Sequence, residues 1–328
     1  MKKHIFPLLL LAATSVFTAC GSMQSFTFDQ LYPADITYPD QVKNVAVVNN
    51  MAEIPTPKDD LLTIGLLEGD GKVAAETLAE ALADSRYFNQ VIICDSALRA
   101  KDELPSDYSA LTQAEVESLA SSLGADMIFS VERVLLQTNR REVFYPELPM
   151  PFEAVELKTT PLIKIYIPSR SKPMAVVSKT DSLYWDITPD LSDKRIVTDG
   201  TMDAMTTLVP YLIPHWGQVT RLYYTGGSVE MRDAVICLRE NDWKEARRLW
   251  QQLYDNRKKG SAKMKAAFNI ALSFEMEGDI DQAIEWLGKA KQLVGSGSED
   301  RQVIAYYEEA LQKKKLDLPK LNLQMGRF

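Results

Sequence analysis

Histidine is almost absent from this sequence. Only two histidines occur in 328 residues, and His4 lies within the apolar N-terminal segment. A Ser-His-Asp triad would therefore depend on His215 alone, and a zinc site built on several histidines is excluded. We expect His215, which stands between Pro214 and Trp216, to be structural rather than a general base. The sequence predicts no catalytic residue set, no metal site and no cofactor.

Cysteine is also scarce, with three residues and no pair at metal-ligand spacing. Cys20 has a separate interpretation, given below, which leaves Cys94 and Cys237. We expect these two to be buried free thiols in different domains, although a compartment outside the cytoplasm would permit a disulfide between them.

Other sequence motifs of ligand-binding and metal sites are missing or incomplete. Gly69-Asp70-Gly71-Lys72 precedes a helical pattern but lacks the spacing of a phosphate-binding loop, so it predicts a glycine turn and a helix start. Five aspartates between Asp181 and Asp199 lack EF-hand spacing, and a solvated acidic rim is favoured over a calcium patch. We therefore expect a protein that is not an enzyme.

No apolar run is long enough to span a bilayer. Lys2 and Lys3 precede an apolar run from Ile5 to Phe17, which is typical of a secretory signal. The ending Val16-Phe17-Thr18-Ala19-Cys20 resembles a bacterial lipobox, although Phe17 stands where Leu is usual. The resemblance implies cleavage before Cys20 and lipid attachment to its sulfur. The alternative is an ordinary signal peptide followed by a chance cysteine.

The lipobox sets the expected location. Residues 1–20 are the predicted lipoprotein signal peptide, and residues 21–41 are a predicted tether. No acidic residue follows Cys20 in Gly21-Ser22-Met23-Gln24. By resemblance to sorting rules in Gram-negative bacteria, this implies an outer-membrane anchor facing the periplasm. The membrane, reached through lipid on Cys20, is thus the first expected partner.

Charge is unevenly distributed along the mature chain. Residues 21–225 contain 17 Lys and Arg against 29 Asp and Glu, a net charge of −12, whereas residues 226–328 contain 18 and 16, a net charge of +2. Nucleic-acid binding relies on neutralising phosphates with basic side chains. The acidic N-terminal domain therefore argues against a nucleic-acid partner.

Residues 42–225 have the pattern of a mixed α/β domain. Short β-branched runs alternate with amphipathic helical runs, and later runs alternate polar and apolar residues as antiparallel strands do. Thr112 and Glu115 form a capping-box signature at one helix start. The predicted strands are 42–48, 91–94, 127–136, 162–167, 174–177, 182–187 and 219–224, and the predicted helices are 72–87, 112–123 and 202–213.

Residues 226–315 predict a short helical domain. Asn241-Asp242-Trp243 with Ala246, and Gly278-Asp279-Ile280 with Ala283, are near-copies of one helix–turn–helix pattern. The small alanines allow close helix approach, and the spacing is tetratricopeptide-like. A third helix at 300–314 is expected to cap the stack, and residues 316–328 are expected to be a tail.

Two family resemblances extend this picture. The order of elements and Gly124-Ala125-Asp126 resemble the amino-terminal domain of TolB and CsgG-type domains. Tyr32-Pro33-Ala34-Asp35-Ile36 and Pro214-His215-Trp216 with Arg221-Leu222-Tyr223-Tyr224 resemble a family of Bacteroidota lipoproteins with tetratricopeptide-like C-terminal helices. Asn50 stands where that family has Arg. The resemblance implies a mixed sheet domain followed by helical hairpins, and no assigned activity.

Two surfaces are candidates for binding. In tetratricopeptide-like repeats the first helices line a concave face, which could bind an envelope protein or peptide. The residues mapped to this face are Met231, Val235, Arg239, Lys265, Phe268, Leu272, Glu275, Met276, Tyr306 and Glu309. The second surface is a polar and aromatic patch where the domains join, formed by His215, Trp216, Arg221, Tyr223 and Tyr224.

Each surface has a plainer interpretation. The concave face could pack on the first domain or stay empty, and the junction patch could be a packed hinge in which Arg221 pairs with a carboxylate. We expect a non-enzymatic protein-binding or scaffold module that uses the helical repeats. The alternative is a small-ligand or glycan sensor that uses the α/β domain.

Lipid attachment is testable at a single atom. In cells fed labelled palmitate, the wild-type protein is expected to carry label, and Cys20→Ala is expected to lose it because the acceptor sulfur is gone. Cys237→Ala is the matched control and should keep the label. An unlabelled wild-type protein that is nevertheless exported would identify an ordinary signal peptide.

Overall fold

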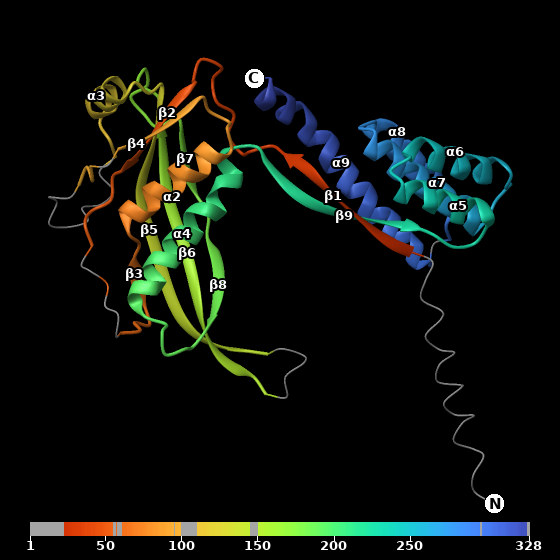
Figure 1. Ribbon diagram of the computed structural model, residues 1–328, viewed down its shortest axis with the longest axis horizontal. Coiled ribbons are helices and arrows are strands. Elements are labelled where there is room, and N and C mark those ends of the chain that lie inside the picture. The colour runs from red at the N-terminus through yellow and green to blue at the C-terminus, as the bar shows by residue number, and fades with distance from the viewer. Residues whose placement is uncertain are drawn as a thin grey trace, which may run out of the picture. The chain divides into compact units, whose positions relative to one another are not determined.

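The protein forms two compact units (Figure 1). The computed structural model describes residues 23–54, 57, 61–94, 96–99, 110–144, 150–295 and 297–326. Unit 1 contains residues 23–32 and 216–322, and unit 2 contains residues 33–215 and 323–326. Each unit has a hydrophobic core of its own.

Unit 2 is built on a seven-stranded mixed sheet. The strand order is β4-β2-β5-β6-β7, with β3 also pairing with β5 and β8 also pairing with β6. β2 runs parallel to β4 and β5, while β3, β6, β7 and β8 join through antiparallel pairs. The strands are β2 (Asn44–Asn49), β3 (Leu66–Glu68), β4 (Gln90–Cys94), β5 (Met127–Val143), β6 (Phe152–Tyr166), β7 (Ala175–Ser178) and β8 (Asp181–Asp186).

Helices cover the two faces of this sheet unequally. α2 (Gly71–Asp84) and α4 (Asp193–Leu212) share one core with alternate strand residues such as Met127 and Phe129. α3 (Gln113–Leu123) packs on the other face, where Val116 meets Ile128. Successive side chains of a strand point to opposite faces, which accounts for the two separate cores. The predicted mixed α/β fold is confirmed.

Local capping explains where two of these helices begin. The Asp70 side chain accepts hydrogen bonds from the backbone N–H groups of Lys72 and Val73, at 2.8 and 3.0 Å. A carboxylate therefore occupies the position that a phosphate would take, and Gly69-Asp70-Gly71-Lys72 is the predicted turn and helix start. Thr112 and Glu115 form the predicted capping box at α3.

Unit 1 combines a two-stranded ribbon with five helices among the residues that the structure describes. Consecutive helices pack as hairpins, and the buried Ala246 and Ala283 lie at equivalent positions in the two copies, as the repeat pattern predicts. Asp242 and Asp279 cap the second helix of each hairpin. The elements are β1 (Met23–Tyr32), β9 (His215–Tyr224), α5 (Val229–Arg239), α6 (Trp243–Asp255), α7 (Ser261–Met276), α8 (Ile280–Leu293) and α9 (Glu299–Met325).

The two terminal segments differ from the sequence interpretation. Residues 21–41 are not simply a tether, because β1 pairs with β9 and its Phe26 packs edge-on against Trp243 at 5.0 Å between ring centroids. Residues 316–325 are not a loose tail, because α9 continues to Met325. The fully buried Gln324 side chain bonds to the backbone of Ala34 and Ile36 at 2.9 to 3.1 Å.

The boundary between the two units also differs from the predicted domain boundary. β9, predicted as the last strand of the α/β domain, lies in unit 1 from Trp216 onward. α4 starts earlier than predicted and continues past Pro210 to Leu212. Cys94 and Cys237 are free thiols in different units, as predicted, but both are half-buried rather than buried. Within the residues described, no helix has the length and hydropathy needed to cross a bilayer.

Gly69 is a position where the fold tolerates no side chain. A Cβ added there would lie 2.6 Å from Thr201 Oγ1 and 2.7 Å from Val134 Cβ. Gly69→Ala is therefore expected to lower the free energy of unfolding by about 1–3 kcal/mol, the usual cost of overpacking. Gly288→Ala, in α8 with nothing within 4 Å, is the control and should be neutral or stabilising. Equal denaturation midpoints for the two variants would contradict the close packing.

Candidate functional site

In unit 2, the carboxyl end of β2 lies beside the middle of the longer strand β5. The two strands are parallel neighbours, with Asn49 opposite Val131. After β2 the chain forms β3, which pairs with β5, and reaches β4 through α2, whereas β5 leads to its antiparallel neighbour β6. Polar side chains, including Asn50 and Glu132, gather where β2 ends beside β5.

Glu132 reaches this position because β5 contains an irregularity. The β5–β6 register runs from Val131 opposite Ile163 directly to Arg133 opposite Leu162, so Glu132 is the extra residue of a β-bulge. A bulge re-aims a side chain out of the regular alternation. The Glu132 side chain is only 1% exposed, although it is a carboxylate.

The partners of Glu132 satisfy only part of this carboxylate. Its Oε2 accepts a hydrogen bond from Asn50 Nδ2 at 3.1 Å and pairs with Lys164 Nζ at 3.4 Å. Its Oε1 is buried and has no hydrogen-bond partner among the described residues, and the same holds for Ser130 Oγ. Leaving a buried polar atom unpaired costs about 1–3 kcal/mol. Glu132 Oε1 and Ser130 Oγ, beside the end of β2, therefore each have capacity for a further hydrogen bond.

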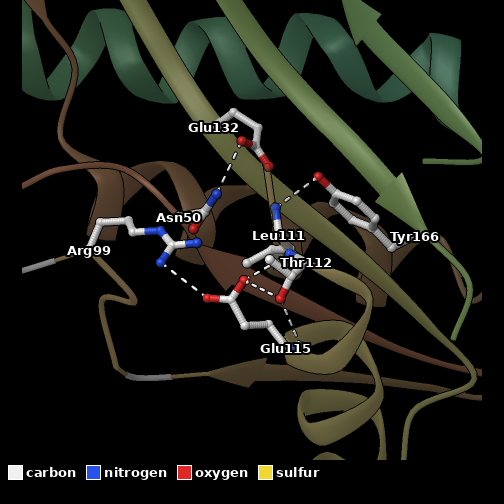
Figure 2. Close-up of polar contacts among 7 residues, drawn as sticks. All are labelled: Asn50, Arg99, Leu111, Thr112, Glu115, Glu132 and Tyr166. Atoms are coloured by element: carbon white, nitrogen blue, oxygen red, sulfur yellow. Dashed lines mark hydrogen bonds and ion pairs between the residues drawn. The ribbon is translucent and has the colours of Figure 1, made fainter. Parts of the chain in front are cut away.

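The start of α3 continues the same polar group of residues (Figure 2). Arg99 Nη1 pairs with Glu115 Oε1 at 3.1 Å, and Glu115 Oε2 accepts from the Thr112 backbone N–H at 2.8 Å. The Tyr166 hydroxyl accepts from the Leu111 backbone N–H at 3.2 Å. We name the whole group the Glu132 cluster; its side chains are those of Asn50, Arg99, Thr112, Glu115, Ser130, Glu132, Lys164 and Tyr166.

Electrostatics within the Glu132 cluster follow from burial and charge. Burial raises the pKa of the Tyr166 hydroxyl, and the negative charge of Glu132 raises it further. The pKa of Glu115 is lowered, first by the hydrogen bond from the Thr112 backbone and also by Arg99. The formal charges of the cluster sum to zero, because two basic side chains (Arg99 and Lys164) are opposed by two acidic ones (Glu115 and Glu132). The arrangement offers hydrogen bonds rather than a strong net field.

Sequence reasoning missed the Glu132 cluster. The stretch Met127 to Leu136 reads as one continuous buried strand, and a bulge leaves no composition signal. The only hint is the charged pair Glu132-Arg133, which interrupts a mostly apolar run from Met127 to Leu136. Asn50 was noted only as a departure from a family pattern.

The concave face predicted in the helical repeats is partly covered. Phe268 of α7 contacts Tyr224 of β9 and Tyr307 of α9, with ring centroids 5.2 and 5.4 Å apart. The chain's own strand and last helix thus cover Phe268, which is one of the residues mapped to that face. Five of the mapped residues are buried: Met231, Val235, Phe268, Leu272 and Glu275. Arg239, Tyr306 and Glu309 are exposed, and Lys265 and Met276 are half-buried.

The predicted junction patch is not one surface. His215 belongs to unit 2, whereas Trp216, which is 69% exposed, belongs to unit 1. Tyr223 and Tyr224 are buried, and their hydroxyls bond to Gln24 and Asp300 at 2.8 and 2.5 Å. Tyr223 thus joins the two strands of the ribbon, and Tyr224 joins β9 to α9.

Arg221 has the carboxylate partner that the plainer interpretation required. Its Nε and Nη2 bond to both oxygens of Glu275, at 2.9 and 3.0 Å. Tyr307 and Lys314 of α9 also bond to Glu275, at 2.7 and 3.2 Å. Burial by itself raises the pKa of Glu275, but Arg221, Lys314 and Tyr307 outweigh it and lower that pKa. The group is a structural ion-pair network inside unit 1.

Comparison with protein families matches most of unit 2. A model for a domain of unknown function, DUF8603, covers residues 42–224, more than half of the 328-residue chain. The chain belongs to the DUF8603 family. The Glu132 cluster lies within the DUF8603 region. A second domain of unknown function, DUF6340, matches residues 232–313 in the helical unit.

Solved structures similar to this DUF8603 protein are distant from it. A PelC dodecamer from Paraburkholderia phytofirmans is 14% identical, covers 58% of this chain and 98% of its own, and gives a TM-score of 0.28. A putative lipoprotein from Caulobacter crescentus CB15 is 14% identical, covers 44% and 80%, and gives a TM-score of 0.22. Likeness at this level says nothing about activity or assembly here. No protein in the curated set matches the chain.

The Glu275 network predicts a large effect of a single substitution. Arg221→Met leaves the buried Glu275 carboxylate without its bidentate partner, and removing one member of a buried pair costs about 3–5 kcal/mol. Chemical denaturation followed by far-ultraviolet circular dichroism should show this loss. Arg248→Met removes an exposed pair with Glu245 and should cost less than about 1 kcal/mol. If both variants lose a similar amount of free energy of unfolding, the buried pair of Arg221 with Glu275 contributes no more to stability than an exposed pair.

Proposed function

We propose that this DUF8603 protein is a non-enzymatic, lipid-anchored protein of the cell envelope whose unit 2 binds a small polar ligand. The anchor rests on the N-terminal sequence, in which Lys2 and Lys3, the apolar run and the lipobox-like ending at Cys20 follow one another in the order of a lipoprotein signal. An outer-membrane location facing the periplasm is part of the proposal.

The observation that carries ligand binding is the incomplete partnering of Glu132. Proteins seldom bury a carboxylate without satisfying both oxygens. Here a β-bulge beside the carboxyl end of β2 directs Glu132 toward Asn50 and Lys164, and its Oε1 has no partner in the described part of the chain. A ligand that donates a hydrogen bond to Oε1 would complete the site.

The chemistry of the Glu132 cluster favours a neutral, hydroxyl-bearing ligand. Glu132 Oε1 is an acceptor, and Ser130 Oγ, buried on the same strand and also without a partner among the described residues, can donate or accept. The balanced charges of Arg99, Lys164, Glu115 and Glu132 give no preference for an ion. A sugar or polyol has paired donor and acceptor hydroxyls that suit such a site.

Binding rather than catalysis is proposed because the site has no poised acid or base. The raised pKa of Tyr166 keeps its hydroxyl protonated at neutral pH. His215, the only histidine after the signal segment, stands at the start of β9 and belongs to none of the contacts that make up the cluster. The helical repeats are not the proposed binding surface because their mapped face is partly covered by β9 and α9.

The proposal is tested with a panel of mono- and disaccharides and polyols. Binding to the full mature chain is detected by thermal shift and quantified by calorimetry. Glu132→Gln should weaken binding of any hit by at least about tenfold, because a hydrogen bond to a charged group contributes about 1.5–3 kcal/mol. Glu142→Gln removes the same charge from an exposed position of β5 and should leave affinity unchanged.

Two results would oppose the proposal. The first is a panel without hits, together with native mass spectrometry that finds no small molecule copurified with wild-type protein. The second is a hit whose affinity is the same in Glu132→Gln. Either result would indicate that Glu132 Oε1 binds only internal water, as buried polar groups often do.

A further inference from the structure

Very little chain separates Cys20 from unit 1. β1 begins at Met23, so only Gly21 and Ser22 lie between the proposed lipid site and the ribbon. Three residue steps span at most about 11 Å when fully extended. The beginning of β1 must therefore lie close to any bilayer that holds Cys20. This step rests on the lipid anchor of the proposed function, whereas the following steps rest on unit 1 alone.

The beginning of β1 lies beside the end of β9. Tyr223 donates to Gln24 near the start of β1, whereas Gly217 approaches Tyr32 at the other end, so the ribbon is antiparallel. Asn269 of α7 then holds Tyr224, accepting from its backbone N–H and donating to its carbonyl at 2.8 and 2.7 Å. The N-terminal half of α7 is thereby placed next to the end of the ribbon that leads to Cys20.

This end of unit 1 is strongly basic. Residues 256–265, the turn before α7 and its first residues, contain five basic residues and no acidic one. Lys265 Nζ lies 5.1 Å from the Tyr224 ring centroid, and Lys263 Nζ donates to the Arg257 carbonyl at 2.8 Å. We name these five residues the basic patch; they are Arg257, Lys258, Lys259, Lys263 and Lys265.

Nearby carboxylates offset the patch only in part. Asp255 precedes it and accepts from Gln251 at 3.0 Å, and Asp300 accepts from the Tyr224 hydroxyl. Glu230 is also close enough to Arg257 to interact with its charge, although no ion pair joins these two described residues. Arg257, Lys258 and Lys259 are exposed, and no ion pair to any of them is found among the described residues. The patch is a solvated positive surface on a protein whose overall charge is −8.

We propose that the basic patch docks unit 1 onto anionic phospholipid headgroups of the bilayer that holds Cys20. Clusters of Lys and Arg next to a membrane anchor are attracted by anionic lipid, and the attraction decays within a Debye length. The short connection keeps the patch within that range of the surface. Lipid on Cys20 provides the attachment, and the basic patch fixes which side of unit 1 faces the bilayer.

Vesicle sedimentation separates the patch from the anchor. The full mature chain carrying Cys20→Ser, which has no lipid, is mixed with vesicles of phosphatidylcholine alone or of two parts phosphatidylcholine to one part phosphatidylglycerol. Binding is expected only to the anionic vesicles and should fall as salt is added. Adding Lys258→Glu and Lys259→Glu should weaken it by at least about tenfold. Arg170→Glu with Lys172→Glu, an exposed pair in unit 2, makes the same change in net charge and should have little effect.

Three outcomes would overturn the docking surface. The first is equal binding to both vesicle types, and the second is equal weakening of binding by the two charge-reversal pairs. The third is that no vesicle is bound, while the protein with the wild-type patch captures an acidic envelope protein that the Lys258→Glu, Lys259→Glu variant does not capture. Palmitate labelling of Cys20 is independent of all three. A failed anchor and a failed docking surface are therefore told apart.

Discussion

The buried carboxylate of Glu275 is the constraint around which unit 1 is arranged. A carboxylate with no exposure is tolerable only when its charge is opposed and both oxygens are bonded. Arg221 from β9 and Tyr307 and Lys314 from α9 meet that need, so one side chain of α7 ties the ribbon and the last helix to the hairpins. The same contacts explain why the mapped face of the hairpins is partly covered, because the strand and helix that satisfy Glu275 also cover Phe268.

A second buried carboxylate, Glu132 in unit 2, provides an instructive contrast. Glu275 has partners on both oxygens, whereas Glu132 has Asn50 and Lys164 on one oxygen and no partner among the described residues on the other. Because both oxygens of Glu275 are bonded within the protein, its network stabilises the fold of unit 1. Partial satisfaction of Glu132 beside the end of β2 gives a site with remaining hydrogen-bonding capacity. The number of bonded oxygens, rather than burial or residue type, distinguishes the two roles.

What could be predicted from the sequence was mostly local. The Thr112–Glu115 capping box, the two hairpin turns and parts of six strands of unit 2 follow from spacing within a few residues, and the structure confirms them. β3, the end of β5 and the first ten residues of β6 were not predicted. What was missed depends on distant partners. Glu275 meets Arg221 across 54 positions, and Gln324 meets Ala34 across 290. β1 was missed because its ten residues contain several polar side chains among Phe26, Phe28 and Tyr32, which gives a weak strand signal until β9 is known. The bulge at Glu132 leaves no trace in composition.

The position of Gln324 has a consequence for how the chain is made. Its side chain bonds to the backbone of Ala34 and Ile36, yet 290 positions separate it from Ala34 in the chain. Domains usually fold in order as they leave the ribosome. Here residues 33–215 of unit 2 are made before residues 216–322 of unit 1, but the Gln324 side chain that bonds to unit 2 is made only after them. An isolated fragment bounded by the family match at residues 42–224 would lack both Ala34 and Gln324. The contact between Gln324 and Ala34 therefore forms only after residues 216–322 of unit 1 have been translated.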